Sequence, residues 1–215
     1  MKSENDLSVR WNRLKFHPVQ SAWWFDKNRV AVVPAGRRSG KTEIAKRKAV
    51  IFGLTYTASA DGWVVLSAPT HLQAKRIFWK DLKRMVPPAL QRQKPSESEL
   101  TIYLLNGVDI TVLGLDVPER IEGRPLDYIV LDEYGNMKPT VWDENVRPAL
   151  STLGREGGAI FTGVPEGRNH YHRLAINAQS PSRPNWSYFH WISADILDPK
   201  EIEEARRDLD ELTFA

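Results

Sequence analysis

The feature that most constrains this 215-residue chain is the tripeptide Gly40-Lys41-Thr42, which follows an apolar run and precedes a helical stretch. Residues 29–33 (RVAVV) are short, apolar and rich in valine, which predicts a buried strand. The pattern G-x-x-x-x-G-K-[ST], between a strand and a helix, directs several backbone N–H groups at one point, and the helix adds its positive end. We therefore expect residues 35–42 to form a phosphate-binding loop. The alternative is a basic helix start that binds no nucleotide.

The residues of this loop differ in the roles that the pattern gives them. Ala35 stands where the pattern has its first glycine, and it must keep a negative φ because alanine reaches positive φ only at a cost. Lys41 is expected to reach the β and γ phosphates, and Thr42 to ligate Mg²⁺. Arg37 or Arg38 can sense the γ-phosphate, or be solvated, or bind a DNA phosphate. The candidate nucleotide-binding residues of the loop are Ala35, Gly36, Arg37, Arg38, Ser39, Gly40, Lys41 and Thr42.

A pair of acidic residues follows a second apolar run, residues 128–131 (YIVL). Asp132 is expected to hold the water shell of Mg²⁺ together with Thr42 as the metal-site residues. Glu133 is expected to polarise the attacking water as a general base, which motors and helicases need and small-molecule kinases do not. The alternative is an acidic turn at the end of a strand.

Short apolar runs alternate with helical stretches along the chain. The expected strands cover residues 29–33, 63–67, 100–105, 108–113, 128–131, 159–162 and 186–193, and the expected helices 18–27, 42–55, 70–86, 139–150, 169–178 and 199–212. This order predicts a mainly parallel sheet covered by helices on both faces. Ligands bind such sheets at the carboxyl ends of the strands. The phosphate loop, residues 67–70, the acidic pair and Thr162-Gly163 all follow predicted strands, so we expect one composite site.

Composition narrows the class of protein. The absence of cysteine excludes a disulfide framework and a cysteine-ligated zinc site. No apolar run has the ~18 residues that a membrane helix needs, and residues 1–10 lack the apolar core of a secretory signal, so we expect a cytoplasmic protein with no membrane partner. The net charge is +3. Between residues 75 and 94 seven basic residues stand against Asp81 alone, which predicts either a polyanion-binding face or a solvated helix face.

The ordered motifs resemble the large terminase subunit of tailed double-stranded DNA bacteriophages, over about residues 16–212. Residues 16–20 (FHPVQ) are similar to the family's adenine-reading segment, with Phe16 and Gln20 in the nucleotide site and Gln20 as the base contact. The loop at 35–42 resembles the family's variant phosphate loop, and 127–133 its acidic motif. Residues 67–70 (SAPT) resemble its second motif, and 162–165 (TGVP) its coupling motif, with Thr162 and Gly163 as the coupling candidates.

This resemblance implies an α/β P-loop NTPase of the RecA-like, additional-strand glutamate class, with a mainly parallel central sheet flanked by helices. It implies an ATP-hydrolysing, Mg²⁺-dependent motor domain that drives double-stranded DNA into the procapsid. The implied partners are double-stranded DNA, further copies of the chain in a ring, the portal and the small terminase subunit, in the host bacterial cytoplasm during virion assembly.

The resemblance also implies an arginine finger donated by a neighbouring subunit of the ring. The candidate stretch is residues 119–125, in which Glu122 stands where related proteins often have an arginine before the glycine. The finger is therefore either Arg120 or Arg124, and the alternative for each is a surface or intramolecular ion pair. The catalytic candidates are Glu133, Lys41, Arg37, Arg120 and Arg124.

We divide the chain into a P-loop ATPase domain at 1–195 and a helical lid or linker at 196–215. The nuclease domain of the family is expected to be absent, and nuclease activity with it. Two other functions stay open. One is a helicase-like nucleic-acid-dependent ATPase, which the single phosphate loop and short length disfavour. The other is a nucleotide-gated assembly module with little turnover.

Overall fold

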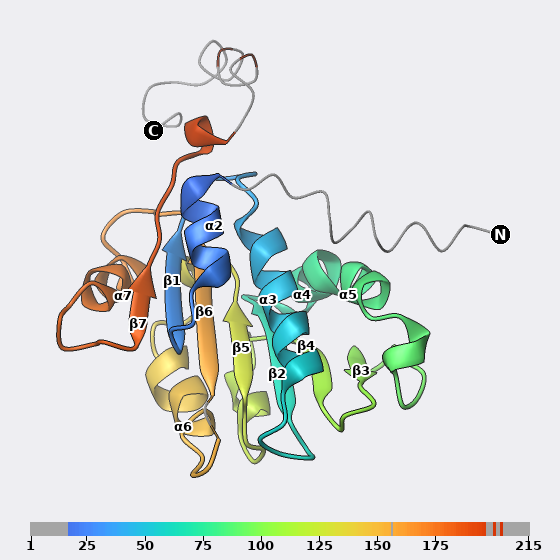
Figure 1. Cartoon of the computed structure of the whole chain (residues 1–215). Helices are drawn as coiled ribbons and strands as arrows, with labels where there is room; N and C mark the ends of the chain where they lie inside the picture. Colours follow the sequence, from blue (N-terminus) through green and yellow to red (C-terminus); the bar gives the residue numbers. More distant parts are fainter. Residues whose placement is uncertain (1–16, 156, 197–199, 201–202, 204–215) are drawn as a thin grey trace.

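A seven-stranded sheet organises the part of the chain that the computed structural model describes, which is residues 17–155, 157–196, 200 and 203 (Figure 1). The strands are β1 (Val30–Pro34), β2 (Trp63–Ala68), β3 (Thr101–Tyr103), β4 (Asp109–Gly114), β5 (Tyr128–Leu131), β6 (Gly158–Gly163) and β7 (Trp186–Tyr188). Their order is β3-β4-β2-β5-β6-β1-β7. Every pairing is parallel except that of β3 with β4. The predicted mainly parallel sheet is confirmed, as is the hairpin of β3 and β4.

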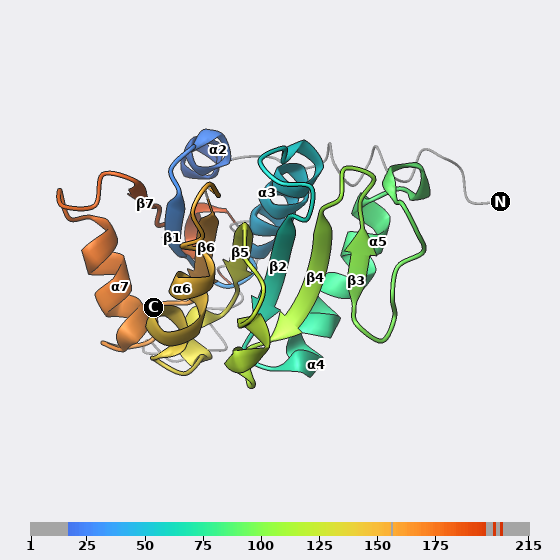
Figure 2. The same ribbon diagram turned by 90° about the horizontal axis from the view of Figure 1, so that it is seen from below.

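Helices cover both faces of the sheet. The α-helices are α2 (Pro18–Phe25), α3 (Lys41–Thr55), α4 (His71–Ala74), α5 (Lys80–Met85), α6 (Arg147–Ala149) and α7 (His170–Ala178). Two π-helical segments are η1 (Lys75–Trp79) and η5 (Val141–Val146), and the short 3₁₀ turns are η2 (Pro88–Leu90), η3 (Pro118–Ile121), η4 (Tyr134–Asn136) and η6 (Ser193–Asp195). Figure 2 shows α2 and α3 on one side of the sheet and α6 and α7 on the other.

Alternate strand residues build a separate core on each face, because successive side chains of a strand point to opposite sides. Leu66 and Val130 belong to the core under α2, α3 and α5. Val65 and Leu131 belong to the other core, under η5 and α7. A strand that is buried on both faces favours apolar residues at every position, which is why β1 and β5 are apolar throughout. In β2 the buried Ser67 interrupts the apolar run, and its hydroxyl donates to Val130 O at 2.6 Å.

The amino-terminal edge of β5 is anchored by the buried carboxylate of Asp127. It accepts hydrogen bonds from the hydroxyl of Tyr56, from Trp63 N at 2.7 Å and from Arg155 Nη1 at 3.0 Å. Burial, reinforced by the neighbouring carboxylate of Asp127, raises the pKa of Tyr56 to about 12. These donors fix the start of the strand whose far end carries the acidic pair.

The predicted helix over 70–86 forms, capped by Thr70, whose hydroxyl accepts from Gln73 N at 3.3 Å. It departs from the prediction in its middle, where η1 replaces a turn of α-helix between α4 and α5. The helix expected over 139–150 is likewise mostly π-helical, as η5 followed by α6. Hydrophobic spacing at the sequence level does not distinguish an extra residue per turn from regular helix.

The strand expected over 186–193 is shorter than predicted. It ends at Tyr188, although Phe189 N still donates to Val32 O of β1 at 3.0 Å, and an isolated parallel bridge then pairs Trp191 with Ala35. Trp191, the apolar residue that continues the alternating pattern, is buried beside the loop that follows β1. The helix expected over 199–212 falls mostly outside the described residues.

Candidate nucleotide-binding site

The predicted site residues meet at the carboxyl edge of three neighbouring strands. The phosphate loop follows β1, the acidic pair follows β5, and Thr162 and Gly163 are the last residues of β6, which lies between β5 and β1. Because parallel strands end at the same edge of the sheet, the three motifs come together although they are far apart in the sequence. The structure thus brings three of the four predicted strand-end motifs together at one edge of the sheet, and their joint function stays a prediction.

Asp132 is the centre of this site. Its side chain is almost fully buried, with the residue 2% exposed. Thr42 Oγ1 lies 3.2 Å from each carboxylate oxygen, and Thr162 Oγ1 donates to Oδ1 at 2.5 Å. Burial raises the pKa of Asp132, and the hydrogen bond from Thr162 and the nearby charge of Lys41 oppose that shift. An ionised carboxylate here is costly without a cation, which is the property expected of a metal-site acid.

Lys41 and Glu133 form an ion pair across the site, with Nζ 3.5 Å from Oε1. The lysine side chain is 7% exposed and the glutamate side chain 34%. Glu133 has left-handed backbone angles, φ +53° and ψ +44°. Such a conformation costs a non-glycine residue of order 1–3 kcal/mol and is concentrated at functional sites. The carboxylate of Glu133 is therefore held partly open to solvent beside a buried lysine.

Gly163 packs closely against this acidic pair. A Cβ added at Gly163 would lie 3.0 Å from a ring carbon of Tyr171 and 3.6 Å from the Cα of Glu133. Its carbonyl accepts a hydrogen bond from Ala35 N at 3.0 Å. The end of β6 therefore contacts both the phosphate loop and the residue expected to activate water.

The backbone of the phosphate loop has the shape of an anion-binding turn. Arg38 and Gly40 take positive φ values of +55° and +84°, and Gly40 caps α3. Ala35 keeps a negative φ, as an alanine in the place of the first glycine must. Ser39 Oγ donates to Gly36 O at 2.6 Å and closes the turn. Alternation of left- and right-handed residues turns successive N–H groups toward one point, which is the geometry that cradles phosphate.

Gln20 lies against the phosphate loop. It is 4% exposed, and its Nε2 donates to Ser39 O at 2.6 Å. Its Oε1 accepts from His17 N at 3.0 Å, in a capping box that begins α2. Its amide therefore links the start of α2 to the loop. Phe16, the other expected residue of the adenine-reading segment, lies outside the described residues.

Among the described residues, no side chain of the three arginine candidates forms an ion pair with Asp132 or Glu133. Arg37 has a 78% exposed side chain, with Nη2 3.5 Å from Oε1 of Glu166. Arg120 is exposed on η3. Arg124 is held in the same chain by Asp109, with Nη1 2.9 Å from Oδ2, at the opposite edge of the sheet.

Several residues that contact the phosphate loop were not singled out by sequence reasoning. Trp191 and Ser193 each donate to a backbone carbonyl of the loop, and His190 donates to the carbonyl of Pro34, the last residue of β1. They belong to no motif with fixed spacing, and only the alternating pattern of residues 186–193 indicated that this segment lies on the sheet.

Mg²⁺ would rest on few protein ligands. Among the described residues, no group of three or more His, Cys, Asp or Glu side chains could hold a metal ion. The hydroxyl of Thr42 and the buried carboxylate of Asp132 match the usual Mg²⁺ site, in which one or two protein oxygens act with substrate phosphates and water.

The described helices include none that is long and apolar enough to cross a membrane.

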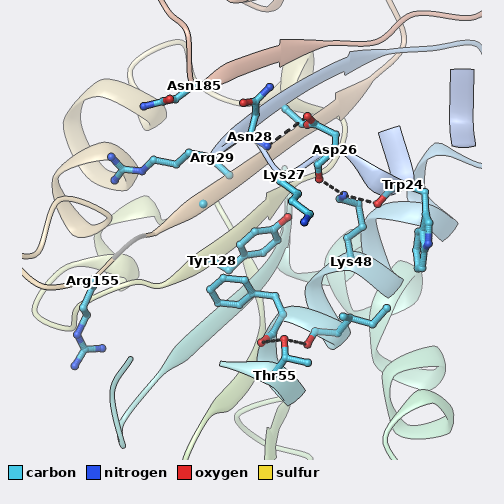
Figure 3. Close-up of a pocket in the computed structure, with 15 residues that line it drawn as sticks. Trp24, Asp26, Lys27, Asn28, Arg29, Lys48, Thr55, Tyr128, Arg155 and Asn185 are labelled. Carbon is cyan, nitrogen blue, oxygen red and sulfur yellow. Dashed lines mark hydrogen bonds between the residues drawn. The ribbon is translucent and has the colours of Figure 1, made fainter. Parts of the chain in front are cut away.

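A separate open pocket of about 900 Å³ lies at the amino-terminal edge of the sheet, and no phosphate-loop residue lines it (Figure 3). Lys48 there donates to the carbonyls of Trp23, Trp24 and Asp26 at 2.9–3.0 Å and so caps the end of α2. Burial lowers the pKa of Lys48. The half-buried ammonium of Lys48 thus serves the fold, and the predicted nucleotide chemistry lies at the other edge of the sheet.

Comparisons with known proteins agree with this geometry. The large terminase subunit of Thermus virus P23-45 is 28% identical over 218 residues, covering 85% of this chain and 43% of that protein. The large terminase subunit of Thermus phage G20c is 27% identical with the same coverage. This chain spans less than half of the length of these curated relatives.

Solved structures share the fold. The ATPase domain of the Thermus phage P74-26 large terminase superposes with a TM-score of 0.76 at 23% identity, covering 99% of this chain and 95% of that one. The large terminase of bacteriophage D6E in complex with ADP gives 0.69 at 19% identity, covering 99% and 51%. The fold is therefore the RecA-like P-loop fold of terminase ATPase domains. The model of the family "Terminase large subunit, T4likevirus-type, N-terminal" matches residues 33–189, and the chain belongs to that family.

Proposed function

We propose that this chain is the ATP-hydrolysing motor domain of a phage large terminase, which drives double-stranded DNA into the procapsid. The observation that carries the proposal is the cluster of Thr42, Asp132 and Thr162 beside the Lys41–Glu133 ion pair, at the edge where the phosphate loop lies. Relatives of the same fold have been solved with ADP and with ATP-γ-S, which supports nucleotide binding at this loop.

In the proposed mechanism each protein group has one task. Lys41 holds the β and γ phosphates. Thr42, together with Asp132 acting through the water shell, would hold Mg²⁺, and the ion would spread the negative charge that develops on the phosphates. Glu133 orients the attacking water and accepts its proton. Without nucleotide, the carboxylate of Glu133 occupies the place beside Lys41 Nζ that a phosphate oxygen takes when nucleotide binds. Nucleotide binding therefore releases Glu133 from Lys41, and its carboxylate can then face the attacking water.

Thr162 and Gly163 are proposed to couple the state of the site to the rest of the domain. The hydroxyl of Thr162 donates a hydrogen bond to Asp132, and Gly163 contacts both Glu133 and the phosphate loop. A shift of the acidic pair on hydrolysis would therefore move the end of β6.

We further propose that the working motor is a ring in which a neighbouring subunit supplies the arginine finger. Arg120 fits this role better than Arg124, because Arg120 is exposed whereas Arg124 is engaged by Asp109 of its own chain. Arg37 remains the candidate sensor within the chain, since it lies in the loop and its guanidinium is exposed.

Double-stranded DNA is the proposed polyanionic partner, with the portal and small terminase subunit as further partners in the host cytoplasm. The basic residues of η1 and α5 point away from the buried face that Ala74, Phe78 and Leu82 provide. These exposed basic residues are Lys75, Arg76, Lys80, Lys83 and Arg84. Lys83 is paired with Glu97, with Nζ 2.6 Å from Oε1. This face is suited to a phosphate backbone.

ATP turnover per subunit, measured over a wide range of protein concentration, tests the proposal, with the Glu133→Ala variant as the blank. Turnover well above the blank is expected, and it should rise with concentration if the finger acts in trans. Turnover no higher than the blank at every concentration, with or without DNA, would contradict the proposal and favour a nucleotide-gated assembly module.

A further inference from the structure

Residues 190–193, which we call the loop-contact segment, make four hydrogen bonds to residues 34–39, at the end of β1 and in the phosphate loop. One is between backbones: Gly36 N donates to Trp191 O at 3.1 Å. Three come from side chains and end on carbonyl oxygens: His190 Nδ1 to Pro34 O at 2.7 Å, Trp191 Nε1 to Ser39 O at 3.2 Å and Ser193 Oγ to Arg37 O at 2.9 Å. The segment thus holds the loop from the side of its carbonyl groups.

Holding a carbonyl also sets the direction of an N–H group. In a planar trans peptide, the C=O of one residue and the N–H of the next point in opposite directions. The carbonyls of Arg37 and Ser39 point to the loop-contact segment, so the N–H groups of Arg38 and Gly40 point away from it. Within the described residues, neither of these N–H groups has an acceptor. They are the donors that a phosphate-binding loop must present to its anion.

The loop needs such outside contacts because part of its backbone is unfavourable in isolation. Arg38 has a φ of +55°, which L side chains rarely adopt. Ser193 donates its hydroxyl to the carbonyl of Arg37, the residue directly before Arg38. The contact is also close: a Cβ at Gly36 would lie 2.3 Å from Ser193 Oγ and 2.4 Å from Ser193 N. Glycine is therefore required at Gly36 for the segment to reach the loop.

We infer that Trp191 and Ser193 are positioning residues, which hold the loop peptides in the orientation that binds nucleotide phosphate. The inference rests on the proposed function, since it requires that the loop binds nucleotide. Neither side chain bonds Glu133, Asp132 or Lys41, so their effect should be on nucleotide affinity and not on the chemical step. Because the loop contacts the phosphates common to both nucleotides, ADP and ATP affinity should change together.

Calorimetric titration of the whole 215-residue chain with Mg-ADP tests this inference. Trp191→Phe keeps an aromatic ring against Trp23, whose ring centroid is 6.0 Å away, but removes the indole N–H donor together with part of the buried ring volume. Ser193→Ala removes the hydroxyl. Matched controls are Trp186→Phe in β7 and Ser182→Ala on the surface before it, neither of which bonds the loop among the described residues.

Ser193→Ala is expected to raise the Kd for ADP by about three- to tenfold, as loss of one net hydrogen bond would. Trp191→Phe should raise it by less, because Gln20 Nε2 also donates to Ser39 O, and the double variant should raise it most. The KM for ATP should rise in parallel while kcat at saturating ATP stays within about twofold, since the catalytic groups are untouched. Both controls should bind as the wild type does. A role in folding alone would instead lower the unfolding temperature without this split between KM and kcat.

Wild-type affinity in Ser193→Ala and in Trp191→Phe would overturn the inference while leaving the proposed function intact. A fall in kcat with unchanged KM would also overturn it. If Trp191→Phe does not fold, Ser193→Ala decides the question alone. Absence of ADP binding by the wild type, matching a Lys41→Ala variant, would overturn both the inference and the proposed function.

Discussion

Thr162 donates its hydroxyl proton to Oδ1 of Asp132 at 2.5 Å, and this bond joins the next-to-last residue of β6 to the acidic residue that follows β5. Both residues are buried, so the carboxylate cannot replace this donor with bulk water. The same carboxylate is shared with Thr42 of the phosphate loop. Three motifs that are distant in sequence therefore depend on one side chain.

Thr162→Val should leave the carboxylate of Asp132 short of a donor. Because removing one partner of a buried charged hydrogen bond costs about 1–3 kcal/mol, the free energy of unfolding should fall by that amount in urea denaturation. Thr162→Ser keeps the hydroxyl and should lose less than half as much. Equal losses in both variants would show that the methyl group, and not the hydrogen bond, matters at this position.

Asp132→Asn should change how stability depends on pH. Burial raises the pKa of Asp132 in the folded protein, so the folded state binds the proton more tightly than the unfolded state does. The ionised side chain therefore opposes folding at neutral pH, and this cost disappears as the pH falls through the raised pKa. We expect Asp132→Asn to be more stable than the wild type at pH 7 without nucleotide or metal, with a difference that narrows on acidification. A difference that widens toward low pH would contradict this account.

The two finger candidates should separate by stability and by turnover. Arg124→Ala breaks the ion pair with Asp109 and should lower the free energy of unfolding by up to about 1 kcal/mol. Arg120→Ala removes an exposed side chain and should leave stability unchanged. In assembled protein Arg120→Ala should reduce kcat by about 10³-fold with ADP affinity preserved. Full turnover in Arg120→Ala would return the role to Arg124 or Arg37.

Charge reversal on the basic helix face tests the DNA contact. Lys80→Glu should weaken binding to duplexes of any sequence. The negative slope of log K against log salt should become shallower by about one, because one phosphate contact is lost. Lys138→Glu, at an exposed lysine of the segment between η4 and η5, is the matched control. Equal binding by both variants would remove α5 from the DNA surface.

Much of the fold can be predicted from the sequence because buried parallel strands appear in it as short, nearly continuous apolar segments. Residues 128–131 and 63–67 were predicted within one residue of β5 and β2, and the loop, Asp132 and Thr162 converge as the strand ends require. What the sequence did not predict depends on three-dimensional packing. The π turns at η1 and η5 change helical spacing without changing hydrophobic pattern.

Two features of the site were equally out of reach of sequence reasoning. The left-handed backbone of Glu133 is imposed by its surroundings, since no local residue favours it. The contacts of residues 190–193 with the loop join segments about one hundred and fifty residues apart through side chains of ordinary type. Spacing rules cannot detect such contacts, and the ion pair of Arg124 with Asp109 is hidden for the same reason.

The most direct test of the proposed mechanism compares ATP binding and ATP turnover in a Glu133→Gln variant, which keeps the size of the side chain and removes its basicity. The mechanism predicts that Glu133→Gln binds ATP about as tightly as the wild type while its turnover falls by about 10²-fold or more, as loss of a general base would cause. Lys41→Ala in parallel should lose binding itself. Turnover in Glu133→Gln equal to that of the wild type would contradict the assignment of Glu133 as the base, and with it the proposed mechanism.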